Sequence, residues 1–456
     1  MSIEIIKETN SQLRTILNDD INVLEQLKKN IKEEPNSLLQ KVSKANLKAQ
    51  DSLCLDKKIN DLISLDNNPV IICNCGSSDG SNSISKYLLK NHFEKIIAGM
   101  CVLAKILNTK EGILYLPANS LSEEMTEKVK AYEEIFCIKL SAGEETLVLR
   151  NETALFQALD GKYIRPFFSD SKINEYNGKP ALVIDGETAC SVFEAINENT
   201  FGKLIYIRSK DNLSYIAEVK LGTKLSDLFE ELGIETGRLK GILLGDMLGK
   251  FITAADLNKI FIENNPLYSS IQIFDDSACM VDETLKVITG SYEQSCGKCV
   301  LCREGTTQYK MILGDITKGK GKIEDLDLIK ETSEIIKIGT FCEFGRTMIE
   351  PVVSSIELFD EEYKDHIRKK KCAASVCKSF LNYYISPADC TGCEECLDAC
   401  PEDAIEGKDG FIHMIDTDLC TKCDKCRTAC PEGAIMIMGA IKPRLPKKLT
   451  KVGKFK

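Results

Sequence analysis

The chain has few of the features that mark an exported, membrane-spanning or nucleic-acid-binding protein. Tryptophan is absent, from which nothing follows, and only three histidines occur among the 456 residues. There is no apolar run of about eighteen residues to cross a membrane, and Glu4, Lys7 and Glu8 stand where a signal peptide needs an apolar core. A net charge of -10 supplies no overall basic face for phosphates. We therefore expect a cytoplasmic protein with no membrane insertion and no nucleic-acid partner.

Cysteine, in contrast, is abundant, with 21 residues. Eight of them lie between Cys390 and Pro431, in two copies of C-x2-C-x2-C-x3-C-P that also share A-C-P-E-x-A-I. In this pattern the first three thiolates of each copy hold one [4Fe-4S] cluster, and the fourth ligates the other cluster. One cluster is thus expected on Cys390, Cys393, Cys396 and Cys430, and the second on Cys420, Cys423, Cys426 and Cys400. Zinc knuckles or a disulfide framework are the alternatives, and eight cysteines in register, each quartet closed by proline, argue against both.

A further set of cysteines predicts a third cluster. Cys296, Cys299 and Cys302 form C-x2-C-x2-C within S-C-G-K-C-V-L-C-R-E-G-T, and Cys342 in G-T-F-C-E-F-G is the candidate fourth ligand. Apolar residues at helical spacing lie between and after them, so a helical bundle can bring the distant ligand back. For four cysteines considered alone, zinc is the alternative metal.

Periodicity divides the chain into successive units. Helical spacing from Ser11 to Glu34, with a stop at Pro35, predicts one amphipathic helix in a unit spanning 1–37. Alternating short strands and helices predict an α/β domain over 38–200, with a strand at Val70–Cys73 and a helix at Ile84–Leu107. The other expected units are a small strand-paired domain (201–280), a helical cluster domain (281–368), a linker (369–387), a ferredoxin unit (388–440) and a basic tail (441–456).

The α/β region carries a recognisable series of motifs. P-V-I-I-C-N (69–74), I-I-A-G-M (96–100), G-I-L-Y-L-P (112–117), E-T-A-L (152–155), G-K-P (178–180) and G-E-T (186–188) occur in that order. With S-C-G-K-C-x-x-C-R-E-G-T, they resemble the flavin-carrying, NADH-oxidising subunit of complex I and its relatives in soluble electron-bifurcating hydrogenases. The resemblance implies an α/β plus α+β multidomain protein: a layered α/β scaffold domain, a β-grasp insert, a helical-bundle [4Fe-4S] domain and a bacterial-type 2[4Fe-4S] ferredoxin domain. It also implies that Asn74, Glu152 and Glu187 are remnants of a flavin or NADH site.

Three elements of that flavin site depart from the family together. Ala45–Leu55, which stands where the family has a glycine-rich phosphate loop, contains no glycine, so the backbone cradle for a phosphate is missing. The family's acidic glycine loop has become Cys75–Gly80, and its Gly-Glu step has become Arg150-Asn151, which puts bulk where the family leaves room for nicotinamide. We predict a scaffold that has kept the fold and lost FMN; a divergent but working flavin site is the alternative.

Two cysteines of the linker and the tail after Ala440 remain unassigned. Cys372 and Cys377 form C-x4-C, similar to the hydrogenase-type relatives, and with His413 they offer part of a zinc site; two reduced bystander cysteines are the alternative. The tail is rich in lysine and carries Pro443 and Pro446, so we expect it to be disordered or to lie on an acidic partner.

No residue stands out as a general acid, base or nucleophile. The sequence therefore favours an iron–sulfur electron-transfer subunit of an oxidoreductase complex, with three [4Fe-4S] clusters and partners of ferredoxin, flavin, hydrogenase or formate dehydrogenase type. The alternatives are an FMN-dependent NADH dehydrogenase subunit and a structural scaffold. The terminal donor and acceptor, whether hydrogen, formate, NAD(P)H, a quinone or an acyl-CoA, are not identified by the sequence.

Overall fold

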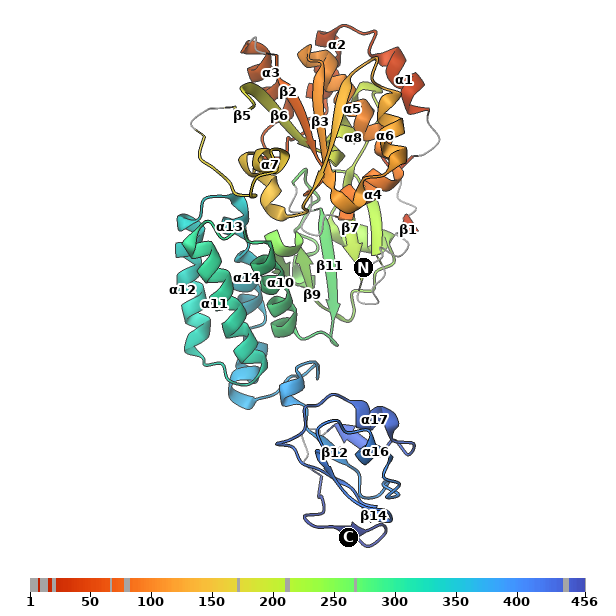
Figure 1. Ribbon diagram of the computed structural model, residues 1–456, viewed down its shortest axis with the longest axis vertical. Coiled ribbons are helices and arrows are strands. Elements are labelled where there is room, and N and C mark those ends of the chain that lie inside the picture. The colour runs from red at the N-terminus through yellow and green to blue at the C-terminus, as the bar shows by residue number, and fades with distance from the viewer. Residues whose placement is uncertain are drawn as a thin grey trace. The chain divides into compact units, whose positions relative to one another are not determined.

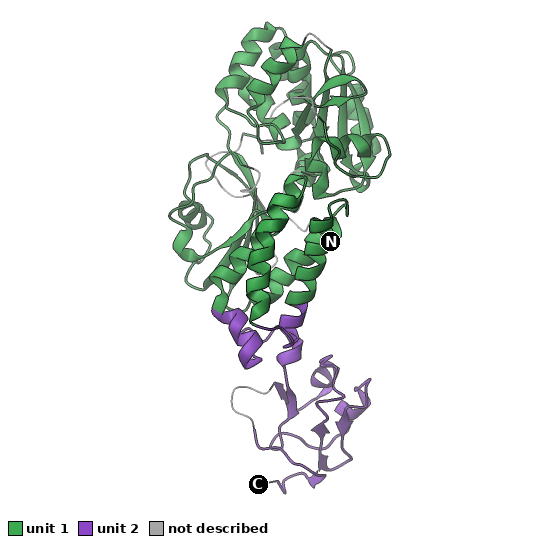
Figure 2. Ribbon diagram, turned by 90° about the vertical axis from the view of Figure 1, so that its left-hand side faces the viewer, with its two compact units in different colours: residues 1–313, 323–360 green, residues 314–322, 361–456 purple. Residues whose placement is uncertain are grey.

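The computed structural model describes residues 7–8, 15–18, 22–65, 68–77, 83–169, 173–209, 214–265, 269–437 and 443–455. The chain divides into two compact units, one formed by residues 1–313 and 323–360 and the other by residues 314–322 and 361–456 (Figure 2). This is coarser than the predicted division into domains. Among the described residues, no helix has the length and apolar character that crossing a membrane requires.

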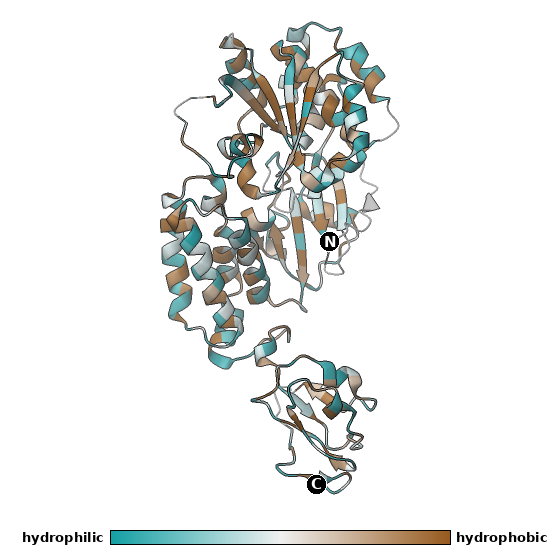
Figure 3. Ribbon diagram, viewed as in Figure 1, coloured by the Kyte–Doolittle hydropathy of each residue, from teal (hydrophilic) through white to brown (hydrophobic). Residues whose placement is uncertain are grey.

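A five-stranded sheet forms the α/β part of the first unit (Figure 1). Its order is β4-β3-β2-β6-β5, in which the first four strands are parallel and β5 runs antiparallel to β6. The strands span Cys137–Gly143 (β4), Glu111–Pro117 (β3), Val70–Asn74 (β2), Lys179–Asp185 (β6) and Glu175–Tyr176 (β5). Every residue of the central strand β2 is buried, as expected when both faces of a parallel sheet are covered (Figure 3).

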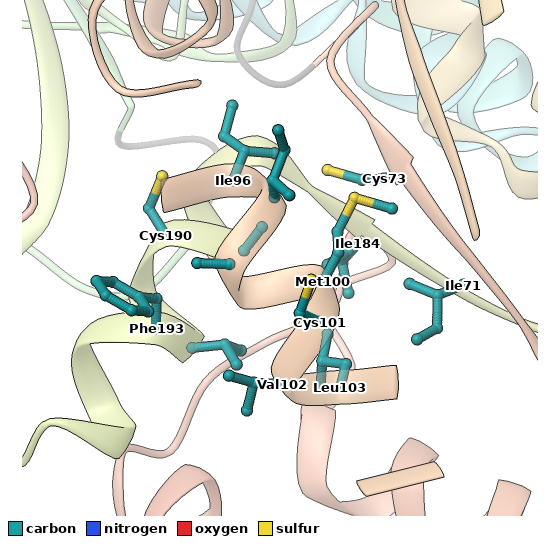
Figure 4. Close-up of a cluster of buried hydrophobic side chains, with 14 of the residues drawn as sticks. Ile71, Cys73, Ile96, Met100, Cys101, Val102, Leu103, Ile184, Cys190 and Phe193 are labelled. Carbon is teal, nitrogen blue, oxygen red and sulfur yellow. The ribbon is translucent and has the colours of Figure 1, made fainter. Parts of the chain in front are cut away.

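The two faces of this sheet have separate cores. Ile71 and Cys73 pack in one hydrophobic cluster with helices α5 (Phe93–Leu107) and α8 (Gly186–Ile196), to which Met100 of α5 and Phe193 of α8 also belong (Figure 4). Val70 and Ile72 face the other way, toward the 3₁₀ turn η2 (Leu147–Arg150) and helix α7 (Glu152–Leu159). This alternation is the period-two pattern of a strand.

One predicted helix of the α/β region is divided into two in the structure. The helix expected at Ile84–Leu107 is two helices, α4 (Ser83–Asn91) and α5, because the backbone leaves helical conformation at His92. Helix α3 spans Leu55–Ser64 and α6 spans Glu123–Lys130.

The predicted N-terminal helix over 11–34 is wrong in extent. Only Val23–Asn30 is helical (α1), beginning where the Asn22 side chain accepts a hydrogen bond from the Glu25 amide. Pro35 does not end a helix but begins α2 (Pro35–Lys44), since proline at the first helical position lacks only an amide that has no partner there. Residues 11–14 and 19–21 lie outside the described residues.

A six-stranded sheet follows, with the order β1-β8-β7-β11-β9-β10. The predicted strand pair is confirmed, with Lys203 opposite Val219 at one end of the antiparallel β7–β8 ladder. Helix α9 (Leu225–Glu231) packs on the same core. The strands span Lys7–Glu8 (β1), Lys203–Arg208 (β7), Ser214–Val219 (β8), Leu239–Leu244 (β9), Lys250–Ile252 (β10) and Ser270–Asp275 (β11).

Helices carry the chain from residue 280 to 364, as the cysteine spacing required. They are α10 (Met280–Gln294), α11 (Val300–Thr317), α12 (Glu324–Gly339), α13 (Glu343–Thr347), α14 (Glu350–Leu358) and α15 (Asp360–Lys364). The buried Tyr309 hydroxyl of α11 donates to the Ile329 carbonyl of α12, 3.0 Å away. Gly305 of α11 faces Ile336, where an added Cβ would lie 2.5 Å from the side chain. The two helices therefore pack closely.

The second unit contains short strand pairs and two short helices. β12 (Tyr383–Ile385) pairs with β16 (Ile435–Ile437), and β13 (Ile405–Glu406) pairs with β15 (Met414–Ile415). The tail is not disordered throughout: β17 (Thr450–Lys451) pairs with β14 (Phe411–Ile412), so backbone hydrogen bonds hold part of it. The helices are α16 (Glu395–Asp398) and α17 (Lys425–Ala429).

Opposite charges hold the segment at Thr15–Leu17 in the first unit. The Glu218 carboxylate accepts from the Thr15 and Ile16 amides at 2.9 Å and from the Gly202 amide at 3.0 Å. Lys95 donates to the carbonyls of Thr15 and Ile16, at 2.7 and 2.9 Å. Both charged side chains are buried, so the segment has little contact with water at these atoms.

Glu218→Ala should lower the free energy of unfolding by about 3 kcal/mol, because several buried amides lose their acceptor at once. Chemical denaturation followed by circular dichroism measures this. The control is Glu230→Ala, which removes an exposed carboxylate of helix α9. It should change the free energy of unfolding by less than about 0.5 kcal/mol. Equal effects of the two substitutions would contradict the assignment.

Candidate functional site

Asn74, the first predicted flavin remnant, is fully engaged by protein groups. At the end of β2, its side-chain amide donates to Gln50 Oε1 (3.1 Å) and to the Leu149 carbonyl (3.0 Å). Its oxygen accepts from the Gly76 amide at 3.0 Å. Gln50 Nε2 donates to the same Leu149 carbonyl at 2.8 Å. Buried polar groups are satisfied here within the chain.

The glycine-free loop at 45–55 closes on itself. The Ala49 amide donates to the Leu53 carbonyl, and the Leu55 amide to the Leu47 carbonyl, both at 2.9 Å. Asn46 and Ser52 adopt positive φ, 48° and 65°, where glycine would be the ordinary choice. The loop therefore keeps left-handed positions, but these two amides point at the chain's own carbonyls and not at a phosphate.

The two glutamate remnants are neutralised by buried lysines. Lys58 Nζ lies 2.6 Å from Glu152 Oε1 and 2.5 Å from Asp51 Oδ2, and Asn174 donates to Glu152 Oε2 at 2.7 Å. Glu187 pairs with Lys203 and accepts from the Leu204 amide. Burial raises the pKa of Glu187, and Lys203 acts against that shift. These two carboxylates form buried ion pairs within the chain, and removing either partner would leave an unpaired buried charge.

The cavities beside these remnants are small. The one lined by Glu187, Thr188 and Lys203 has a volume of about 30 Å³. The one lined by Arg150, Glu152 and Cys342 has a volume of about 240 Å³. Pockets for cofactor-sized ligands occupy roughly 300–1,000 Å³. Both volumes lie below this range.

The four cysteines predicted to hold the cluster of the helical domain lie together. Cys296 and Cys299 lie in the loop between α10 and α11, Cys302 is in the first turn of α11, and Cys342 precedes α13. Burial raises the pKa of Cys302 to about 11; the Ser295 hydroxyl opposes the shift, and the thiols of Cys342, Cys296 and Cys299 add to it. Four neighbouring soft sulfurs fit a [4Fe-4S] cluster, whose iron displaces the protons.

The ferredoxin-type cysteines gather around two positions. Burial raises the pKa of Cys396 to about 12, and the nearby thiols of Cys390, Cys430, Cys393 and Cys426 add to this. Burial also raises the pKa of Cys426, where the added contributions come from Cys420, Cys400 and Cys423. The fourth cysteine of each copy thus lies with the first three of the other.

The internal repeat extends to the backbone around these sulfurs. The Ala404 amide donates to Cys400 Sγ and the Ala434 amide to Cys430 Sγ, both at 3.3 Å. Glu394 and Asp424 occupy equivalent positions and both have φ of 68°. Amide donors to cluster sulfurs raise reduction potentials, so the two copies offer their clusters similar environments.

The histidine that lies with Cys377 is His366, and the predicted His413 lies elsewhere. His366 Nε2 is 3.4 Å from Cys377 Sγ, and the ligand atoms of His366, Cys372 and Cys377 lie within 4.8 Å of one another. His413 Nδ1 instead lies 3.8 Å from Cys390 Sγ. The choice of His413 is therefore corrected: the folded chain brings it to a ferredoxin cysteine. The spacing H-x5-C-x4-C was the signal that could have identified His366.

His366 is prepared as a ligand. Its Nδ1 lies 2.8 Å from the Glu362 carbonyl oxygen, which only accepts hydrogen bonds. The proton is therefore on Nδ1, and Nε2 presents its lone pair toward Cys377. All three side chains are buried, and the ring packs edge-on against Phe380. A buried imidazole with two thiols is a ligand set that zinc prefers.

Family models match three parts of the chain. Residues 55–194 match the Nuo51 FMN-binding domain, residues 282–366 match the NADH-ubiquinone oxidoreductase-F iron-sulfur binding region, and residues 389–434 match a 4Fe-4S dicluster domain. The resemblance to this family of flavoprotein subunits is thus confirmed. The first match begins at residue 55 and does not include the glycine-free loop.

Similar proteins are subunits of oxidoreductases. The NADP-reducing hydrogenase subunit HndC of Solidesulfovibrio fructosivorans is 28% identical over 378 residues, covering 74% of this chain and 76% of that protein. An NADH-quinone oxidoreductase subunit of Rhizobium meliloti is 22% identical, covering 66% and 81%. A chain of a NAD+-reducing [NiFe]-hydrogenase shares the fold, with a TM-score of 0.71 and 20% identity over 80% of this chain and 68% of that chain. The chain is thus similar, over about two thirds or more of its length, to these oxidoreductase subunits.

The crossed grouping predicts reciprocal effects of two substitutions. Cys400→Ala should damage the cluster of Cys420, Cys423 and Cys426, with loss of up to about four iron per chain, because that cluster loses its fourth thiolate. Cys430→Ala is the matched control and should damage the Cys390 cluster. Electron paramagnetic resonance and iron analysis of anaerobic protein distinguish the two. Selective loss of the Cys390 cluster from Cys400→Ala would show that the ligation is not crossed.

Proposed function

We propose that this chain relays electrons between partner subunits through three [4Fe-4S] clusters and holds no FMN. Two observations together carry the proposal. Three cysteine quartets are brought together, and the remnant side chains Asn74, Glu152 and Glu187 of the flavin-type site are bonded to other side chains of the protein. With clusters alone, the chain supplies one-electron transfer and leaves bond chemistry to its partners. Thiolate-ligated clusters suit a reducing cytoplasm.

An FMN-dependent NADH dehydrogenase subunit is the second candidate. The match of residues 55–194 to an FMN-binding domain favours it. Against it, Gln50 and the loop amides occupy hydrogen bonds that a flavin phosphate would need. In the family of the resemblance, NADH delivers a hydride to flavin, so a chain without flavin needs a partner's redox centre as donor.

The proposed partner is a subunit with its own redox centre, docked at the end of α12 nearest Cys342. Three apolar side chains of α12 are exposed, Leu328 near its start and Ile335 and Ile338 near its end, and Ile338 is 84% exposed. Val300, next to the cluster ligand Cys299, is also exposed. An exposed apolar stripe rarely stays uncovered in a stable protein. Electron transfer requires a donor to approach the cluster, so we assign this face to the redox partner.

FMN content decides between the two candidates. Protein purified without oxygen should contain about twelve iron and twelve sulfide per chain, release no FMN on acid treatment and leave artificial acceptors unreduced with NADH. Because a flavin can be lost during purification, free FMN should also be titrated into the protein, with no saturable fluorescence quenching expected. Stoichiometric FMN, or tight rebinding, would favour the dehydrogenase. Clusters that no partner reduces would favour the structural scaffold.

A structural zinc ion in the linker is part of the proposal. His366, Cys372 and Cys377 supply three of the four ligands of a closed site. Metal analysis should give about one zinc per chain, and His366→Ala should remove it, since an imidazole is lost. His413→Ala is the control and should retain zinc. Zinc-free protein prepared without chelator would leave Cys372 and Cys377 as bystanders.

A further inference from the structure

Arg150 lies beside the cluster site of the helical domain. It ends the turn η2, and its side chain is 5% exposed. The cavity of about 240 Å³ has both Arg150 and the cluster ligand Cys342 on its wall. Arg150 Nη2 lies 3.5 Å from Oε2 of Glu343, the residue that follows Cys342. A buried cation thus stands close to a ligand of the predicted cluster.

The two charges of this pair differ in their exposure to water. Arg150 is buried, whereas the Glu343 side chain is 47% exposed. Water and salt screen the exposed carboxylate much more than the buried guanidinium. The buried cation therefore acts on the cluster ligand with less attenuation than its partner anion does.

The other charges that line the cavity are already compensated. Asp51 and Glu152 share Lys58, which lies 2.5 Å from the first carboxylate and 2.6 Å from the second. Among the described side chains that line this cavity, Arg150 is the single cation. Replacing Arg150 by a neutral residue would lower the local charge by one unit. Asp51 and Glu152 would keep their ion pairs with Lys58.

We propose that the buried charge of Arg150 raises the reduction potential of the cluster on Cys296, Cys299, Cys302 and Cys342. Reduction of that cluster adds one electron from the partner's redox centre, makes or breaks no bond, and increases the negative charge by one. A nearby buried cation stabilises the reduced cluster relative to the oxidised one. The inference rests on the proposed function only in requiring a cluster in this quartet.

The test is a redox titration of the full chain under anaerobic conditions, followed by electron paramagnetic resonance. Arg150→Met keeps much of the volume and removes the charge, so one of the three cluster transitions should move to a lower potential. Arg150→Lys keeps the charge, so the potential of this cluster should stay close to that of the wild-type protein. Glu343→Gln removes the anion of the pair and should move the same transition the other way, by an amount that falls as salt is added.

Two controls separate an electrostatic effect from damage to the fold. The transitions of the two ferredoxin clusters should stay in place, and Arg238→Met, which removes an exposed guanidinium of the six-stranded sheet region, should shift none of the three. An unchanged potential in Arg150→Met with full iron content would overturn the proposal, as would equal shifts of Arg150→Met and Arg150→Lys. Should Arg150→Met not fold, Glu343→Gln alone still tests the sign. Iron and FMN contents of the wild-type protein test the proposed function separately.

Discussion

The carbonyl oxygen of Leu149 accepts hydrogen bonds from two buried side-chain amides, those of Gln50 and Asn74, and the arrangement of the flavin-type region depends on it. A buried amide without a partner costs about 1–3 kcal/mol, so each of the three groups is held in place by the others. Their convergence ties the loop at 45–55, the end of β2 and the turn η2 together.

The position of η2 then decides what faces the cluster. The Leu147 amide at its start donates to Gln294 Oε1 at the end of α10, at 2.9 Å, and Arg150 at its end reaches Glu343. The same turn therefore joins the parallel sheet to the helices that carry the cysteines. The Gln50 side chain, which stands in the glycine-free loop, bonds to Leu149 and Asn74 and so connects that loop to η2.

The retained glutamates have a reason to persist without a cofactor. Lys58 and Lys203 are buried with their partners, and removing one member of a buried ion pair costs about 3–5 kcal/mol, because the other charge stays in a poorly solvated place. A glutamate kept for such a reason looks, in the sequence, the same as one kept for binding NADH. Asn74, Glu152 and Glu187 could be located from motifs, but their partners Gln50, Lys58 and Lys203 could not. Contacts over 24, 94 and 16 residues leave no local pattern in the sequence.

Other features could be predicted from the sequence where they depend on local spacing, and could not where they depend on contacts between distant segments. Cysteine spacing of two or three residues places sulfurs around one cluster whatever the rest of the chain does, so the quartets were predictable, Cys342 included once a helical return was assumed. The strand at Thr450–Lys451 was not, because it depends on pairing with the distant strand Phe411–Ile412. His366 was missed for a different reason: His413 also had a plausible distance in sequence, and only the fold shows which ring has its Nδ1 proton bound to a carbonyl.

If the chain holds no FMN, as proposed, the cluster of the helical domain must receive its electrons from another subunit. A cluster that accepts electrons from a flavin in its own chain can be shielded by that chain, whereas one that accepts from another subunit needs an approach from outside. Exposed Val300 and Ile338 provide an apolar surface for such an approach, and the cavity behind Cys342 is occupied on one side by the Arg150 guanidinium. Because reduction adds negative charge to a site partly removed from water, a fixed buried cation on the far side favours electron arrival from the partner.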